Sequence, residues 1–203
     1  MTPRIRRFLA LVLLVATAVG CGGGDPTITS QQLATIMPSS ADAPPGTTLG
    51  ASESGPRTLV EFVSETDVRR KLEQLGFKVA YQATFATPAF PADPSKAPPG
   101  AALYGAFAVV LRDGKAATNG LAFYSKRVQK RAKDATPVVT EELGPDAFAY
   151  RFSSLPEAPL PGAVYFWRVG NALFSVVGAG NPGPEPAAVR ALATTIDRRA
   201  KRS

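Results

Sequence analysis

The pattern of apolar and polar positions predicts helices and strands that alternate along most of the chain. A short helix is expected to begin at Thr29 or Ser30, either of which can cap its free amides, and to end at Pro38. The stretch 39–56 is rich in Pro, Gly, Ser and Thr, which is typical of an exposed loop or linker. We expect no regular elements within it.

A longer helix is expected over residues 58–75. Spacings of four and three positions place three of its apolar residues on one helix face: Val68, Leu72 and Leu75. Gly76 follows them and can adopt the left-handed conformation that ends a helix. Residues 59–64 also fit a strand, but we favour the helix.

Two strands and a helix are expected next. Strict alternation over 77–85 predicts a half-buried strand, and the more continuous apolar run 102–111 predicts a strand covered on both faces. A Pro-rich loop, 88–100, separates the two strands, and Asp113-Gly114 predicts a turn. Residues 115–133 then have the pattern of a helix.

The second half of the chain has the same order of elements. We expect a strand at 146–152, a loop at 156–162, a hairpin formed by 164–168 and 172–177 around Gly170-Asn171, and a closing helix over 186–201.

An offset of 68 positions relates the two halves. It pairs Leu75-Gly76 with Leu143-Gly144, Val109 with Val177, Val128 with Ile196, and Arg131-Ala132-Lys133 with Arg199-Ala200-Lys201. We therefore expect a single α+β domain over 29–203, an antiparallel sheet with helices packed on one face. The offset predicts two duplicated ββα-like halves, 58–133 and 134–203. Chance agreement in an Ala- and Arg-rich chain is the open alternative.

Residues 1–20 have the layout of an export signal, with a basic start and small residues before a cut. The apolar run from Phe8 to Val19 is too short to span a bilayer, which takes about 20 residues. The segment is therefore expected to be removed.

The residues Ala18-Val19-Gly20-Cys21 resemble the lipobox of bacterial lipoproteins, although that family prefers Leu where this chain has Ala18. The resemblance implies a diacylglyceryl group on Cys21 and cleavage after Gly20. A conventional signal cut near Ala16 or Ala18, or a buried structural cysteine, is the alternative. Residues 21–28 are expected to form a flexible leash.

The rest of the chain is similar, more loosely, to envelope lipoproteins of high-GC bacteria, a group that implies no activity. The features shared are the lipobox, the Gly-rich leash, strands led by Leu-Gly, and the segment 166–171, Phe-Trp-Arg-Val-Gly-Asn, before a C-terminal helix. Both resemblances imply an exported protein held at the outer face of the cytoplasmic membrane, or at an outer membrane where one exists.

Composition excludes several chemistries. The chain has no His, which removes Ser-His-Asp and Cys-His triads and the His-based zinc sites. Cys21 is its only cysteine, so no internal disulfide is expected. Without residues 1–20, 20 basic residues face 16 acidic ones, a net charge of +4. We expect no metal and no cofactor.

Basic residues gather near the ends of two predicted helices: Lys126, Arg127, Lys130, Arg131, Arg198, Arg199 and Lys201. They could contact anionic lipid headgroups or cell-wall polymers. The alternative is a solvated helix end, where cations complement the helix dipole. Nucleic acid is not an expected partner, because no recognition motif accompanies the charge.

Two further groups of residues could carry a site. Glu141, Glu142 and Asp146 could serve a hydrolase only if two carboxylates faced each other across a substrate. The aromatic residues of 148–152 and 165–167 could line an apolar binding face, although core packing is their more common role.

Three functions follow in order of preference. The first is a non-catalytic, membrane-tethered domain that binds or scaffolds an envelope protein, a cell-wall polymer or a lipid. The second is a carrier or sensor with an apolar cavity between sheet and helices that holds a lipid or another apolar ligand. The third is a His-independent hydrolase that acts on cell-wall material.

Overall fold

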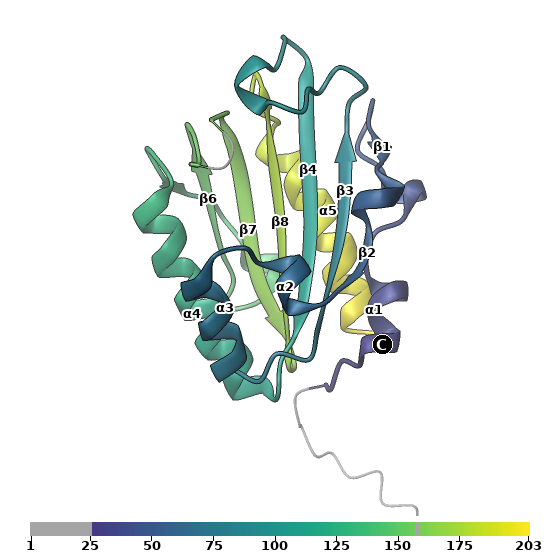
Figure 1. Cartoon of the computed structure of the whole chain (residues 1–203), viewed down its shortest axis with the longest axis vertical. Helices are drawn as coiled ribbons and strands as arrows, with labels where there is room; N and C mark the ends of the chain where they lie inside the picture. The colour runs from purple at the N-terminus through teal and green to yellow at the C-terminus, as the bar shows by residue number, and fades with distance from the viewer. Residues whose placement is uncertain (1–25, 157–158) are drawn as a thin grey trace, which may run out of the picture.

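The computed structural model describes residues 26–156 and 159–203 (Figure 1). They form one antiparallel sheet in the strand order β1-β3-β4-β8-β7-β6-β5, with β2 also paired to β3. The strands are β1 (Thr48–Leu49), β2 (Gly55–Arg57), β3 (Val79–Ala86), β4 (Ala101–Val110), β5 (Thr136–Pro137), β6 (Phe148–Phe152), β7 (Gly162–Val169) and β8 (Ala172–Asn181). The predicted α+β fold on an antiparallel sheet is confirmed.

Helices cover both faces of this sheet, so the expectation that they pack on one face is wrong. Helices α2, α3 and α4 lie on the face turned to the viewer in Figure 1, and α5 and α1 lie on the far face. The helices are α1 (Ser30–Ile36), α2 (Leu59–Phe62), α3 (Thr66–Gln74), α4 (Gly114–Arg131) and α5 (Pro186–Ala200). Short 3₁₀ turns are η1 (Ser40–Asp42), η2 (Ala51–Glu53), η3 (Pro94–Lys96) and η4 (Glu141–Leu143).

The central strands explain the two helical layers, because β4 and β8 are apolar on both faces. Ala108 and Val110 of β4 belong to the buried cluster that contains the apolar residues of α5, whereas Val109 belongs to the cluster that contains those of α4. Successive side chains of a strand point to opposite faces. A strand that is apolar at consecutive positions therefore needs a cover on each side.

Local signals are confirmed at several element ends. Thr29 caps α1 in a capping box with Gln32. Gly76 has the left-handed φ of 71° after α3, and Gly170-Asn171 turns the hairpin between β7 and β8. Asp113 does not form the turn predicted there but accepts a hydrogen bond from the amide of Ala116 and caps α4.

Three expectations about the first third of the chain are corrected. The stretch 39–56 is not a plain loop, because β1 and β2 pair with β3 at the sheet edge. The helix expected over 58–75 is two helices, α2 and α3. The leash does not extend to residue 28: Ile28 is 1% exposed, and its backbone N–H donates to Asn171 Oδ1 at 2.7 Å.

The two halves share the order of their elements, as the expected duplication requires, but not their arrangement in space. The units β3-β4-α4 and β7-β8-α5 place β4 beside β8, antiparallel to it. A two-fold axis that exchanges these strands would leave both helices on one face, whereas α4 and α5 lie on opposite faces. The two halves are therefore not related by that rotation.

The predicted signal sequence and lipobox, including Ala18, Val19, Gly20 and Cys21, lie outside the described residues. Within 26–156 and 159–203, no helix has the length and hydropathy needed to cross a bilayer.

Candidate functional site

A cavity of about 340 Å³ lies between the sheet and the helical layer of α2, α3 and α4. We call it the front cavity. Its floor is formed by side chains of the three central strands β4, β8 and β7: Phe107, Val109, Leu173, Ser175, Val177, Val164 and Phe166. Its cover is the segment 62–65 between α2 and α3, and its side wall is the last two turns of α4.

The break between α2 and α3 shapes the cover. Thr58 caps α2 in a capping box with Glu61, and the helix ends at Val63, whose backbone is extended. Glu65, also extended, precedes α3. Three residues therefore cross the edge of the cavity without being helical, and the guanidinium of Arg69 holds this crossing by donating to the Val63 carbonyl at 3.0 Å.

Helix α4 lies close to the sheet at Gly120. A Cβ at this position would lie 2.6 Å from Leu173 Cδ1, so no larger residue fits without displacing that side chain. The cavity begins beyond this contact, along the later α4 residues Tyr124, Arg127, Val128 and Arg131. Helix α4 is thus close to the sheet at Gly120 and leaves an opening between itself and the sheet along its last two turns.

Aromatic rings form much of the wall. Tyr124 stacks on Phe166 with ring centroids 5.4 Å apart, and Phe166 stacks on Phe148 at 4.9 Å. Phe62 of the cover meets Phe107 of the floor edge-to-face at 6.1 Å. These contacts leave an apolar surface suited to a hydrocarbon or ring.

Three hydroxyl groups interrupt this surface, those of Ser64, Tyr124 and Ser175. Ser175 lies on β8 between Phe107 and Phe166 of the neighbouring strands. The Tyr124 and Ser175 hydroxyls have no hydrogen-bond partner among the described residues. Burial raises the pKa of Tyr124 to about 12, so its hydroxyl is protonated at neutral pH and can donate a hydrogen bond.

Two of the predicted basic residues, Arg127 and Arg131, line the front cavity. Both donate to Glu65 of the cover, Arg131 Nη1 to Glu65 Oε1 at 2.9 Å, and Arg127 Nη1 also donates to Asp67 Oδ2 at 2.9 Å. The Arg127 side chain is 19% exposed and that of Glu65 42%. Hydrogen bonds from Arg127 and then Arg131 hold the pKa of Glu65 below its ordinary value.

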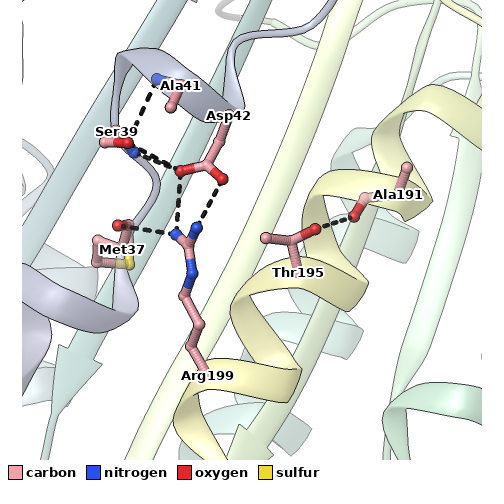
Figure 2. Close-up of polar contacts among 7 residues, drawn as sticks. All are labelled: Met37, Ser39, Ala41, Asp42, Ala191, Thr195 and Arg199. Atoms are coloured by element: carbon pink, nitrogen blue, oxygen red, sulfur yellow. Dashed lines mark hydrogen bonds and ion pairs between the residues drawn. The ribbon is translucent and has the colours of Figure 1, made fainter.

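Arg199, another predicted basic residue, binds within the fold. Its guanidinium contacts both oxygens of Asp42, at 2.7 and 3.0 Å, and joins α5 to η1 (Figure 2). The Asp42 side chain is 13% exposed. Burial raises the pKa of Asp42, but the Arg199 and Ser39 hydrogen bonds outweigh it and leave that pKa below its ordinary value.

The remaining predicted basic residues have different surroundings. Lys201 binds the buried Asp197 at 2.7 Å. Lys126, Lys130 and Arg198 are exposed and form no ion pair within the described part of the chain. The ends of α4 and α5 that carry these residues lie at opposite ends of the molecule (Figure 1). The structure therefore does not gather the predicted basic residues on one surface.

A second cavity, of about 290 Å³, lies at the end of the molecule where residue 26 is placed. Pro26 lines it together with Lys201, Gly170, Asp146 and Arg168. The C-terminal end of α5 is thus close to the point where the chain enters the described fold.

The predicted acidic grouping does not form a facing pair. Glu142 pairs with Arg190 at 3.5 Å, and Asp146 pairs with Arg168 at 3.4 Å. Glu141 is exposed. Among the described residues, no group of three or more acidic, His or Cys side chains could hold a metal ion.

Sequence reasoning missed Glu65, Tyr124 and Ser175 as cavity residues. Arg127 and Arg131 are four positions apart on a helix, where like charges destabilise one another unless an acid lies between them. That spacing could have prompted a search for a partner such as Glu65. The single Ser175 within an apolar strand was a second signal.

Comparison with known proteins adds a fold relationship. No protein-family model matches the sequence, and no curated protein matches it. The crystal structure of the extracellular domain of PknH from Mycobacterium tuberculosis is similar, with a TM-score of 0.57 and 10% sequence identity. The match covers 89% of this chain and 100% of that chain. At this identity the similarity shows that the two chains share a fold.

Proposed function

We propose that the chain is an exported, lipid-anchored binding domain of the cell envelope that holds a small apolar ligand in the front cavity. The observation that carries this proposal is the cavity itself, which is about 340 Å³ and apolar except for a few polar groups. Small-molecule sites are commonly about 300–1,000 Å³ and have the same make-up. The protein performs no chemistry on the ligand in this proposal.

Two observations support the envelope location. The lipobox residues resemble those of bacterial lipoproteins, and two acyl chains hold a protein more firmly than one. The fold is also that of a domain described as extracellular in Mycobacterium tuberculosis. A binding domain at this location would present its cavity to molecules outside the cytoplasm.

The proposal is tested by filling the cavity. Residues 21–203 contain every described element, so this chain with Cys21→Ser can be purified without detergent and titrated with the neutral apolar dye Nile red. Ser175→Phe places a ring on the cavity floor without breaking a hydrogen bond. We expect it to weaken dye binding about tenfold or more, the factor for roughly 1.4 kcal/mol of lost apolar contact.

Ser175→Ala is the matched control, because it removes the same hydroxyl and leaves the volume open. It should bind the dye as the parent chain does. Emission of the single tryptophan, Trp167, which is buried on the far face of the sheet, checks that both variants are folded. Equal dye binding by the parent chain and Ser175→Phe would contradict the proposal.

A further inference from the structure

The charged side chains at the front cavity balance one another. Arg127 and Arg131 line the cavity together with Glu65, and Asp67 binds Arg127 from just outside it. Two guanidinium groups thus meet two carboxylates, and neither arginine is free. Within the described residues, every other lining residue is apolar or carries a hydroxyl. The cavity wall therefore has no excess charge to offer a ligand.

A balanced wall disfavours a charged ligand of either sign. An ion that enters an apolar space loses its hydration, and only a charge partner with further hydrogen bonds could offset that cost. A carboxylate would have to displace Glu65 from the arginines, and an ammonium group would have to displace an arginine from Glu65. An uncharged ligand leaves these ion pairs as they are.

The neutral polar side chains that line the cavity in the described part of the chain all carry hydroxyl groups: Ser64, Tyr124 and Ser175. Ser64 belongs to the cover and is exposed to solvent. Ser175 lies on the apolar floor, opposite both Phe107 and Phe166 in the strand register. Tyr124 lies on the side wall formed by α4, between this floor and the ion pairs.

The surroundings of Tyr124 leave its hydroxyl available as a donor. Its ring stacks on Phe166 with centroids 5.4 Å apart, and Arg127 follows it by three positions on the same helix face. Burial raises the pKa of Tyr124 to about 12, with smaller and opposite effects from the charges of Arg127 and Glu65. The protonated hydroxyl has no hydrogen-bond partner among the described residues, so its O–H can be donated to a ligand.

We propose that the ligand of the front cavity is an uncharged amphiphile whose polar group is a carbonyl oxygen, of the ester or ketone class. Its carbonyl accepts a hydrogen bond from the Tyr124 hydroxyl, and its apolar part lies on the floor formed by Phe107, Phe166 and Val177. A carbonyl oxygen suits this donor because it accepts a hydrogen bond and brings no charge into the apolar space. This inference rests on the proposed function and specifies the ligand of the same cavity.

Butyrophenone and butylbenzene form a matched pair of probes, because they share a carbon skeleton and differ only by a carbonyl in place of a methylene group. Isothermal titration of residues 21–203 carrying Cys21→Ser should show binding of both. Tyr124→Phe removes the hydroxyl and keeps the stacked ring. It should lower the affinity for butyrophenone about fivefold, the factor for one hydrogen bond, and leave that for butylbenzene unchanged.

The outcomes separate this inference from the proposed function. The same change for both probes in Tyr124→Phe, or no change for either, would overturn the inference and leave the apolar cavity intact. Binding of neither probe by the parent chain would overturn the proposed function as well.

Ser175→Ala is the matched control, because it removes a hydroxyl from the floor of the same cavity. It should leave the affinity for both probes unchanged, and emission of Trp167 checks that each variant is folded. An equal loss of butyrophenone binding in the Tyr124 and Ser175 variants would show that Tyr124 does not place the carbonyl, and would overturn the inference.

Charged analogues test the balance of the wall. The ions 4-phenylbutanoate and 4-phenylbutylammonium keep the phenylalkyl chain and carry opposite charges at neutral pH. Both should bind about tenfold or more weakly than butyrophenone, because neither finds an unpaired charge of the opposite sign. Binding of either ion as tight as that of butyrophenone would overturn the inference.

Discussion

Arg198 and Arg199 are adjacent on α5, yet only one of them belongs to the folded interior. Arg198 is exposed and has no ion pair in the part of the chain that the structure describes, whereas Arg199 binds Asp42 through two nitrogens (Figure 2). The Asp42 carboxylate also accepts a hydrogen bond from the backbone N–H of Ser39 at 2.8 Å. Charge at a helix end thus says little about role until the partner of each side chain is known.

This pair gives a matched test at the residue scale. Arg199→Gln should lower the free energy of unfolding by about 1 to 2 kcal/mol, between the values for exposed and for buried ion pairs. Arg198→Gln should change it by less than about 0.5 kcal/mol, as surface substitutions commonly do. Urea unfolding followed by Trp167 emission measures both.

The same pair predicts a dependence on pH. The folded pKa of Asp42 is lowered below its ordinary 3.8, so its contribution to stability is present above that value and is lost as the pH falls through the lowered pKa. The difference between Arg199→Gln and the parent chain should therefore be full at pH 7 and shrink below pH 3.8. A difference that is constant from pH 7 to pH 3 would contradict the account of this contact.

At the scale of elements, locally encoded features were predicted well. Helix α1 has its capping box within four residues, α4 and α5 are long and periodic, and the hairpin of β7 and β8 turns at two adjacent residues. Each of these signals lies within a few positions of the element that it specifies. The sequence alone was therefore sufficient for them.

Features that depend on distant contacts were predicted poorly. Strands β1 and β2 are two and three residues long and exist because β3 supplies their hydrogen bonds from about 30 positions away. The helices on both faces follow from β4 and β8 being apolar on both sides. The apolar run 102–111 indicated this for β4, but a continuous run does not say which helix covers which face.

The candidate site was predicted only in outline. One of the functions proposed from the sequence was a carrier or sensor with an apolar cavity between sheet and helices. Arg127 and Arg131 were named as candidate site residues, but for contact with an anionic surface. The volume depends on how far α4 stands from the sheet beyond Gly120, which is a packing distance and has no local signal. Arg199 and Lys201 were grouped with the cavity arginines because charge alone does not separate them.

At the scale of the whole molecule, the exposed basic residues of α4 and α5 lie at opposite ends (Figure 1). Lys201 shares a cavity with Pro26, so the α5 end is near the side from which the lipid anchor would extend. An anchor there would bring the exposed Arg198 and Arg202 close to anionic headgroups, where each basic residue contributes about 1 kcal/mol. The basic end of α4 would then face away from the membrane.

This orientation predicts unequal effects of equal charge changes. With the Cys21 thiol of residues 21–203 coupled to a single acyl chain, which gives reversible membrane binding, Arg198→Glu with Arg202→Glu should weaken binding to vesicles containing anionic phospholipid about tenfold or more. Lys126→Glu with Lys130→Glu, an identical change in charge, should have a smaller effect. Vesicle sedimentation measures both variants, and equal losses would show that net charge rather than orientation governs binding.

The central claim is that the front cavity binds a small apolar ligand, and its location can be measured directly. Methyl NMR of residues 21–203 carrying Cys21→Ser, titrated with decan-1-ol, reports both faces of the sheet at once. Val109, Val164 and Val177 line the cavity, whereas Val169, Val176 and Val189 pack on the far face. The account predicts saturable chemical-shift changes in the methyl groups of the three cavity valines. No shift, or shifts confined to the far-face valines, would contradict it.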